Sequence, residues 1–71
     1  MNVELVRTLQ NCVDSTDRLL EMNARDQERI RECLGGELMN AYVEGADVTK
    51  EGLKRLKDMI LQLQTAAQAE I

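Results

Sequence analysis

The chain has 71 residues, a formal net charge of −4, and no histidine, tryptophan or phenylalanine. This length allows one small domain with an aliphatic core, and the acidic balance argues against the basic surface by which proteins bind nucleic acids or anionic membranes. Because only Cys12 and Cys33 carry thiols, a four-ligand zinc site within one chain is excluded.

A heptad pattern covers the first half of the chain. Its positions alternate in steps of three and four: Val6, Leu9, Val13, Thr16, Leu20, Asn23, Gln27, Ile30 and Leu34. A second column, spaced by seven, widens the apolar face: Leu5, Cys12, Leu19, Asp26 and Cys33. No glycine or proline interrupts the pattern, so it predicts one helix over about residues 2–34, about 50 Å long.

The middle of this helix, Asn23 to Arg29, is polar and has the sequence NARDQER. Oppositely charged residues three or four positions apart stabilise the segment as a helix. We interpret the segment as solvent-exposed. Asn23 and Gln27 could in addition fix the register of a coiled coil. Both belong to the heptad pattern of alternating threes and fours, whose positions form the seam, the stripe of a helix that faces a packed neighbour.

All four glycines lie in the central part of the chain. The pair Gly35–Gly36 predicts the end of the first helix, since glycine accepts the left-handed backbone that is common after a helix. A short helix is then expected over about residues 37–44, with an apolar face that includes Leu38 and Tyr42 and with Gly45 at its end. A helix this short needs tertiary contacts to form.

The last helix is expected over about residues 50–69, with Thr49 as its N-cap and Val48 packed on Leu53. Its seam again alternates in threes and fours: Leu53, Leu56, Ile60, Leu63 and Ala67. Several basic residues lie near its start: Lys50, Lys54, Arg55 and Lys57. The helix dipole disfavours cations there, so they predict acidic neighbours on the first helix or on a partner.

These elements predict an all-α fold, a helical hairpin of one long and one medium amphipathic helix with a short helix between them, in a single domain over residues 1–71. The expected hairpin core consists of Ile30, Leu34, Leu53, Leu56, Ile60, Leu63 and Ala67. The first helix would outrun the last by about 18 Å, which would leave its N-terminal apolar face uncovered. We therefore predict a partner-binding surface made of Val3, Leu5, Val6, Leu9, Cys12, Val13, Leu20, Leu38 and Tyr42.

A dimer is one way to cover such a face. An antiparallel pairing of two first helices about Asn23 would place Cys12 near Cys33 of the partner subunit. Within one helix the two cysteines are about 31 Å apart, so they cannot form a disulfide there. We expect two free thiols in a reducing compartment, with the intermolecular bridge as the alternative.

The sequence carries no catalytic or ligand-binding motif. Without a histidine base, a nucleophile motif or a phosphate-binding glycine loop, we expect no enzyme activity, no cofactor and no small-molecule substrate. The order of short helix, turn and last helix matches a helix-turn-helix, but the acidic turn EGADVT argues against DNA binding. No apolar segment approaches the roughly 20 residues that span a bilayer, and the N-terminus lacks a signal-peptide pattern, so a cytoplasmic protein is expected.

The segment from Gly45 to Ala66, GADVTKEGLKRLKDMILQLQTA, resembles the small co-chaperones of bacterial type III secretion. The resemblance implies a helical hairpin with a Gly/Ala turn before an amphipathic second helix. It also implies a role in escorting needle subunits together with a second chaperone. The polar segment at residues 23–29 and the ELMNAYV segment depart from the shortest members of that family.

Together these features predict a non-enzymatic interaction module, an adaptor or chaperone that masks an apolar helix of another protein through its heptad faces. The partner would be a second copy of the chain, a helical target protein, or both. Two alternatives remain. One is a small phage-type inhibitor or anti-activator that docks on a host regulator or ATPase. The other is a structural subunit of a coiled-coil assembly.

Overall fold

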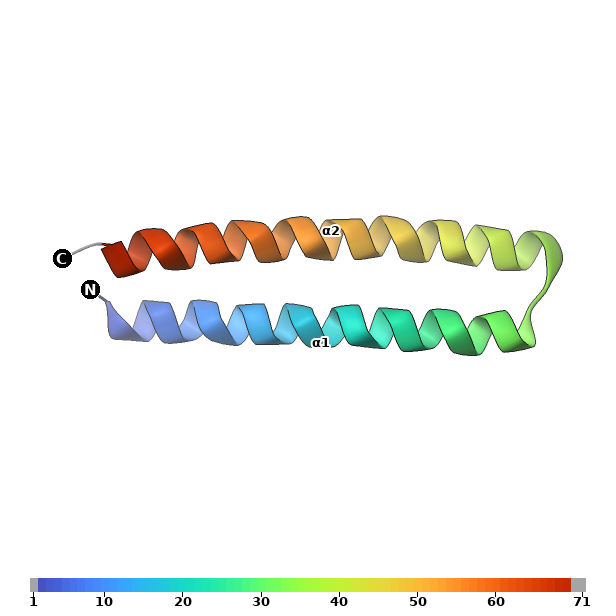
Figure 1. Ribbon diagram of the computed structural model, residues 1–71, viewed down its shortest axis with the longest axis horizontal. Helices are drawn as coiled ribbons and strands as arrows, with labels where there is room; N and C mark the ends of the chain where they lie inside the picture. The colour runs from blue at the N-terminus through green and yellow to red at the C-terminus, as the bar shows by residue number, and fades with distance from the viewer. Residues whose placement is uncertain (1, 70–71) are drawn as a thin grey trace.

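The computed structural model describes residues 2–69 as two antiparallel helices joined by a tight turn (Figure 1). Helix α1 spans Val3–Cys33 and helix α2 spans Gly36–Ala69, with 31 and 34 residues respectively. The Cα trace measures 55 × 15 × 9 Å, so the hairpin is a single layer of two helices. The predicted all-α helical hairpin is confirmed; Met1, Glu70 and Ile71 of the predicted domain lie outside the described residues.

Both ends of α1 are capped by neighbouring residues. At its start, the Leu5 amide donates a hydrogen bond of 3.0 Å to the side-chain oxygen of Asn2. At its end, Leu34 is the C-cap, and its amide donates to the carbonyl oxygen of Ile30 at 2.8 Å. Gly36 then has a φ of +65°, the left-handed conformation that side-chain-bearing residues disfavour. The chain therefore reverses at the predicted glycine pair.

Helix α2 runs through the segment where two separate helices were predicted. The Thr49 hydroxyl does not cap a new helix but donates to the Gly45 carbonyl oxygen within α2, at 3.1 Å. A heptad column continues through the whole helix: Met39, Ala46, Leu53, Ile60 and Ala67. Packing of this column on α1 outweighs the cost of an interior glycine, about 1 kcal/mol.

Because α2 is continuous, the two helices have nearly equal length and their free ends lie together (Figure 1). The expected overhang of the first helix is therefore absent. Val6 and Leu9 are half-buried and Val13 is 5% exposed. The C-terminal part of α2 lies beside them, as the hydrogen bond of 2.9 Å from Gln64 to Gln10 shows.

The core between the helices is thin. Its buried apolar residues are Val13, Ala46, Ile60 and Ala67. Thr16 and Gln27 are also buried, and they occupy seam positions that the heptad pattern of α1 predicted. Among residues 2–69 no side chain is less than 2% exposed. Each helix thus buries one narrow stripe and leaves the rest of its surface to its surroundings.

A polar layer crosses the two helices near the turn. The Asn23 side-chain nitrogen donates to the Ala46 carbonyl oxygen at 3.2 Å, and the Gln27 amide nitrogen donates to Asn23 Oδ1 at 2.9 Å. The same Gln27 nitrogen lies 3.5 Å from Asp47 Oδ1. These contacts require one relative position of α1 and α2, which fits the register role suggested for Asn23 and Gln27.

The turn yields a first prediction from its two glycines. Gly36→Ala should lower the free energy of unfolding by about 1 kcal/mol, because alanine is strained at a positive φ. Gly35→Ala is the matched control, since its backbone is not left-handed and an added Cβ would meet nothing within 4 Å. Urea unfolding followed by circular dichroism measures both. Equal effects of the two substitutions would contradict the left-handed turn.

The polar layer yields a second prediction. Asn23→Ala should cost about 1 kcal/mol of unfolding free energy, because it removes the bond to Ala46 and the acceptor for Gln27. In a double-mutant cycle, Asn23→Ala and Gln27→Ala should couple by at least about 0.5 kcal/mol. Arg25→Ala, on the exposed surface between them, should change stability by less than about 0.5 kcal/mol. Additive effects of the Asn23 and Gln27 changes would show that the layer does not act as a unit.

Candidate protein-binding face

The two sides of the hairpin differ in the contacts that they make. On one side, Lys57 Nζ lies 2.6 Å from Asp17 Oδ1, an ion pair that joins the helices. The hydrogen bond between Gln64 and Gln10 lies on the same side. The acidic neighbours predicted for the basic residues of the last helix thus include Asp17. Both members of the ion pair are at least one-third exposed, so it is worth at most about 1 kcal/mol.

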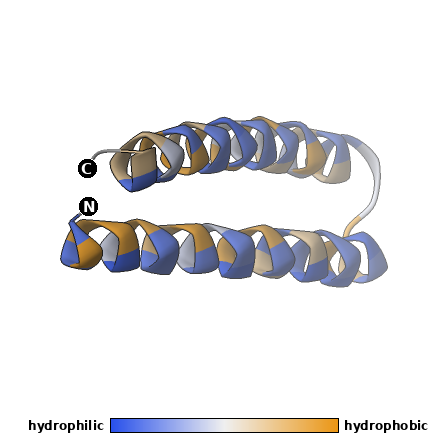
Figure 2. Ribbon diagram, turned by 60° about the vertical axis from the view of Figure 1, so that its left-hand side comes forward, coloured by the Kyte–Doolittle hydropathy of each residue, from blue (hydrophilic) through white to orange (hydrophobic). Residues whose placement is uncertain are grey.

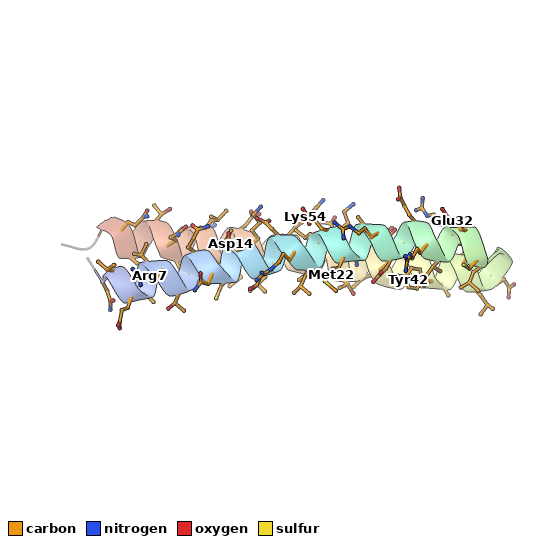
Figure 3. The ribbon with its side chains drawn as sticks, turned by 90° about the horizontal axis from the view of Figure 1, so that it is seen from below. Arg7, Asp14, Met22, Glu32, Tyr42 and Lys54 are labelled. Atoms are coloured by element: carbon orange, nitrogen blue, oxygen red, sulfur yellow. The ribbon has the colours of Figure 1, made fainter. Side chains whose placement is uncertain are left out.

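Ionised residues gather along this side, which we call the charged face. Heptad spacing places these α1 residues on it: Arg7, Asp14, Asp17, Glu21, Glu28 and Arg31. The α2 members are Glu44, Asp47, Glu51, Lys54 and Asp58. In Figure 3, Asp14 and Lys54 lie along one edge of the hairpin, while Met22 and Tyr42 lie along the other.

The opposite side is what we call the uncharged face. Its α1 members are Leu5, Thr8, Cys12, Ser15, Leu19 and Met22. Its α2 members form two columns spaced by seven, Tyr42, Thr49, Leu56, Leu63 and Leu38, Gly45, Gly52, Met59, Ala66. None of these residues is Asp, Glu, Lys or Arg. Toward the turn, Asp26 and Arg29 bring charge into the α1 columns.

Two shallow grooves follow the seam on the uncharged face and show that both helices contribute to it. One groove is lined by Thr8, Asn11, Cys12, Ser15, Thr16, Leu19, Leu56 and Ile60. The next is lined by Leu19, Met22, Asn23, Asp26, Thr49 and Leu53. Leu19 lines both grooves, so they are neighbours along the junction of α1 and α2.

Large apolar side chains on the uncharged face are open to solvent. Leu56 is 47%, Leu63 57% and Met59 60% exposed, and on α1 Leu19 and Met22 are about as open. Complete burial of an exposed side chain of this size is worth about 1.5–3 kcal/mol, so burial of the half that is still exposed is worth about 1 kcal/mol. Figure 2 shows hydrophobic residues recurring along both helices between hydrophilic ones. A contiguous exposed apolar surface of this kind is typical of a protein-binding site.

The structure separates the residues predicted to bind a partner. Four of them lie on the uncharged face: Leu5, Cys12, Leu38 and Tyr42. Four others lie in the seam between the helices: Val6, Leu9, Val13 and Leu20. Val3 is exposed on the side of the charged face. Partner binding by the exposed members stays a prediction, whereas the seam members pack on α2.

The predicted hairpin core separates in the same way. Ile60 and Ala67 are buried in the seam, and Ile30 and Leu53 are half-buried there. Leu34 is exposed at the turn, and Leu56 and Leu63 lie on the uncharged face. Other residues take their places in the seam, Lys57 and Gln64, each one position later. The long side chains of Lys57 and Gln64 reach from the seam to polar partners on the charged face, which an apolar-only pattern does not anticipate.

The site also contains residues that sequence reasoning did not assign to it. Leu19 was expected only to widen the apolar face of the first helix, and Gly45 to end the short helix. Met22, Met59 and Gly52 also lie on the uncharged face. Ala46 was placed at a turn and is instead buried against α1. The signal that could have found the face is the absence of charge in two columns of α2 spaced by seven, and in the matching columns of α1 as far as Met22.

Chemical groups of other kinds are sparse in the described structure. Within residues 2–69, no three His, Cys, Asp or Glu side chains come together where a metal ion could bind. Cys12 and Cys33 are free and exposed. In the same range, neither helix contains a segment long and apolar enough to span a bilayer.

Comparison with known proteins adds no identification: the chain matches no protein-family model, no curated protein and no solved structure.

Proposed function

We propose that this chain is a non-enzymatic protein–protein interaction module of the cytoplasm, which binds or masks a helical surface of another chain. The observation that carries the proposal is the uncharged face, with Leu19, Leu56, Met59 and Leu63 open to solvent along both helices. A helix that packs in the groove between α1 and α2 would bury these side chains. Helix-in-groove binding of this kind needs apolar anchors and a rim that tolerates water.

The size of the hairpin supports the same proposal. A layer of two helices buries one stripe of each, and a stable domain needs a second layer against the remaining apolar surface. Chains below about 70–80 residues often obtain that layer from another subunit. The module therefore acts as half of a helical bundle, and a dimer and a complex with a helical target both use the uncharged face.

An adaptor or chaperone role agrees with the resemblance to type III secretion co-chaperones in its amphipathic second helix. The Gly45–Ala46 pair, which corresponds to their turn, lies inside α2 in this chain. A chaperone would keep an otherwise insoluble partner in solution through the uncharged face, whereas an inhibitor would use the same face on a target that is already folded.

The proposal predicts that protein neighbours contact one side of α2 only. A photo-reactive amino acid at Met59 should form covalent adducts with a polypeptide in the producing cell. The same residue at Asp58, one position away on the charged face, is the matched control and should give at most a trace of adduct. Denaturing gels of both samples before and after illumination measure the difference. No adduct at Met59, or equal adducts at both positions, would contradict the proposal.

A further inference from the structure

We infer that the uncharged face is occupied by a second copy of this chain, in a four-helix bundle with α2 antiparallel to α2 and Gly52 at the two-fold axis. The inference rests on the proposed function and names its partner. In such an isologous contact each residue meets a residue of the same face on the other copy. The face must therefore complement itself in size and charge.

The sizes of side chains along α2 satisfy this requirement. Met59 and Gly45 are each seven residues from Gly52, on opposite sides. When two α2 helices cross at Gly52, the long Met59 side chain of one copy meets Gly45 of the other. Leu56, four residues beyond the axis, likewise meets Thr49, which lies three residues before it.

The outer positions of α2 continue this pattern. Ala66 and Leu38 are each fourteen residues from Gly52, so a small side chain again meets a large one. Leu63 meets Tyr42, an aromatic ring on which an aliphatic side chain can pack. The larger side chains lie mostly in the C-terminal half of α2 and the smaller ones in its central part. An antiparallel crossing brings these two groups together.

The interior glycines of α2 gain a physical reason in this arrangement. In the hairpin alone, a Cβ at Gly45 or Gly52 would meet nothing within 4 Å. Each glycine nevertheless weakens the helix by about 1 kcal/mol relative to alanine. A second helix that crosses at these positions approaches closely only where side chains are absent, because the distance between helix axes depends on the residues at the contact.

Charge also favours a second copy. The net charge of −4 would cause repulsion if ionised residues faced each other across a dimer. In this arrangement the charged face of each copy points outward, and the ionised residues left in the contact are Asp26 and Arg29 of α1. A second copy presents the same uncharged surface along α2, so no other protein with a matching uncharged surface is needed.

The area of the face is adequate for a dimer. The α2 columns from Leu38 to Ala66 run for about 42 Å at 1.5 Å per residue. The Cα trace is 15 Å wide across both helices, so the face of α1 and α2 together measures about 600 Å² on each copy, somewhat below the roughly 800 Å² per partner of a standard interface. The contact is thus at the lower end of stable interfaces, and all of it is uncharged on α2.

The same axis determines how the two α1 helices meet. Asp17 lies beside Lys57, and Gln10 beside Gln64, so the residue of α1 beside Gly52 is close to position 22. Two α1 helices that cross there place Cys12 of one copy opposite Cys33 of the partner subunit. Both cysteines are exposed and lie in one column of α1. Two such Cys12–Cys33 contacts would form, one toward each end of the dimer. This register coincides with the pairing about Asn23 that the heptads of α1 suggest.

The native cysteines provide the test. Purified chain at tens of micromolar should sediment at twice the monomer mass of 8.1 kDa. Oxidised glutathione, which accepts the two electrons released when two thiols form a disulfide, should give a covalent dimer on a non-reducing gel. Mass spectrometry of its peptides should find Cys12 joined to Cys33. Sedimentation as a monomer, or Cys12–Cys12 and Cys33–Cys33 bridges in place of the mixed bridge, would overturn the inference.

A second pair of variants tests the α2 contact in a chain whose native cysteines are serine. Gly45→Cys with Met59→Cys should form disulfide-linked dimers, because the two positions meet across the axis but lie about 21 Å apart within one helix. Glu44→Cys with Asp58→Cys has the same spacing on the charged face and should remain at least tenfold less cross-linked. Equal cross-linking of the two variants would contradict the register. If Met59 photo-adducts carry a different polypeptide while the chain is monomeric, the proposed function stands and the second copy is excluded.

Replacement of the glycines in α2 distinguishes a role in the dimer contact from a role in the single hairpin. Gly45→Ala with Gly52→Ala should weaken the dimer at least tenfold in sedimentation equilibrium, because the added methyl groups hold the helices apart. If the glycines served the single hairpin only, the same change would leave the mass measured by sedimentation unaltered. It would raise the helical signal in circular dichroism, because alanine favours a helix more than glycine does. A dimer as tight as that of the natural chain would therefore count against the close crossing.

Discussion

Two helices packed side by side can bury only one stripe of each, and this constraint governs the whole molecule. The seam of α1 and α2 buries Val13, Ala46, Ile60 and Ala67, and two of these four are alanine. Burial of so few carbon atoms gives little hydrophobic stabilisation at about 25 cal/mol per Å². The remaining apolar residues cannot join the seam, because the helical period turns them to another side. They become either a cost to solubility or the surface of an interface.

The two sides of the hairpin differ in the interactions that they make. The Lys57–Asp17 pair joins the helices on the charged face, and the polar layer at Asn23 and Gln27 sets their relative position within the seam. Such contacts specify register more than they stabilise, since a largely exposed ion pair contributes less than about 1 kcal/mol. On the uncharged face, burial of apolar side chains would contribute more to stability than to register. Leu56, Met59 and Leu63 are each about half exposed, and burial of the exposed half would contribute about 1 kcal/mol for each side chain. Together these gains exceed the contribution of the exposed ion pair.

The first helix could be predicted from sequence because its period is long and uninterrupted, and Thr16, Asn23 and Gln27 lie in the seam as the heptads indicate. The second helix was harder, because local signals and the long-range period disagree. Thr49 resembles an N-cap and Gly45 a helix end, yet Ala46 needs a continuous helix to pack on α1. The seam predicted for the last helix was also one position too early at two places. The apolar pattern selected Leu56 and Leu63, whereas Lys57 and Gln64 are the half-buried residues. The inward-facing position went to side chains that could reach Asp17 and Gln10.

The corrected second helix changes where a partner is expected and how folding and binding are related. A bare N-terminal overhang would have left the hairpin complete and added a separate binding segment. Equal helices place the open apolar surface along the whole length of the seam, so the residues proposed to bind a partner flank those that hold the fold together. The grooves contain both kinds, Ile60 from the core and Leu19 from the face. When a partner covers the grooves, it also excludes water from the seam, and the stability of the hairpin then rises with partner concentration. The proposed association would therefore be thermodynamically coupled to folding of the hairpin.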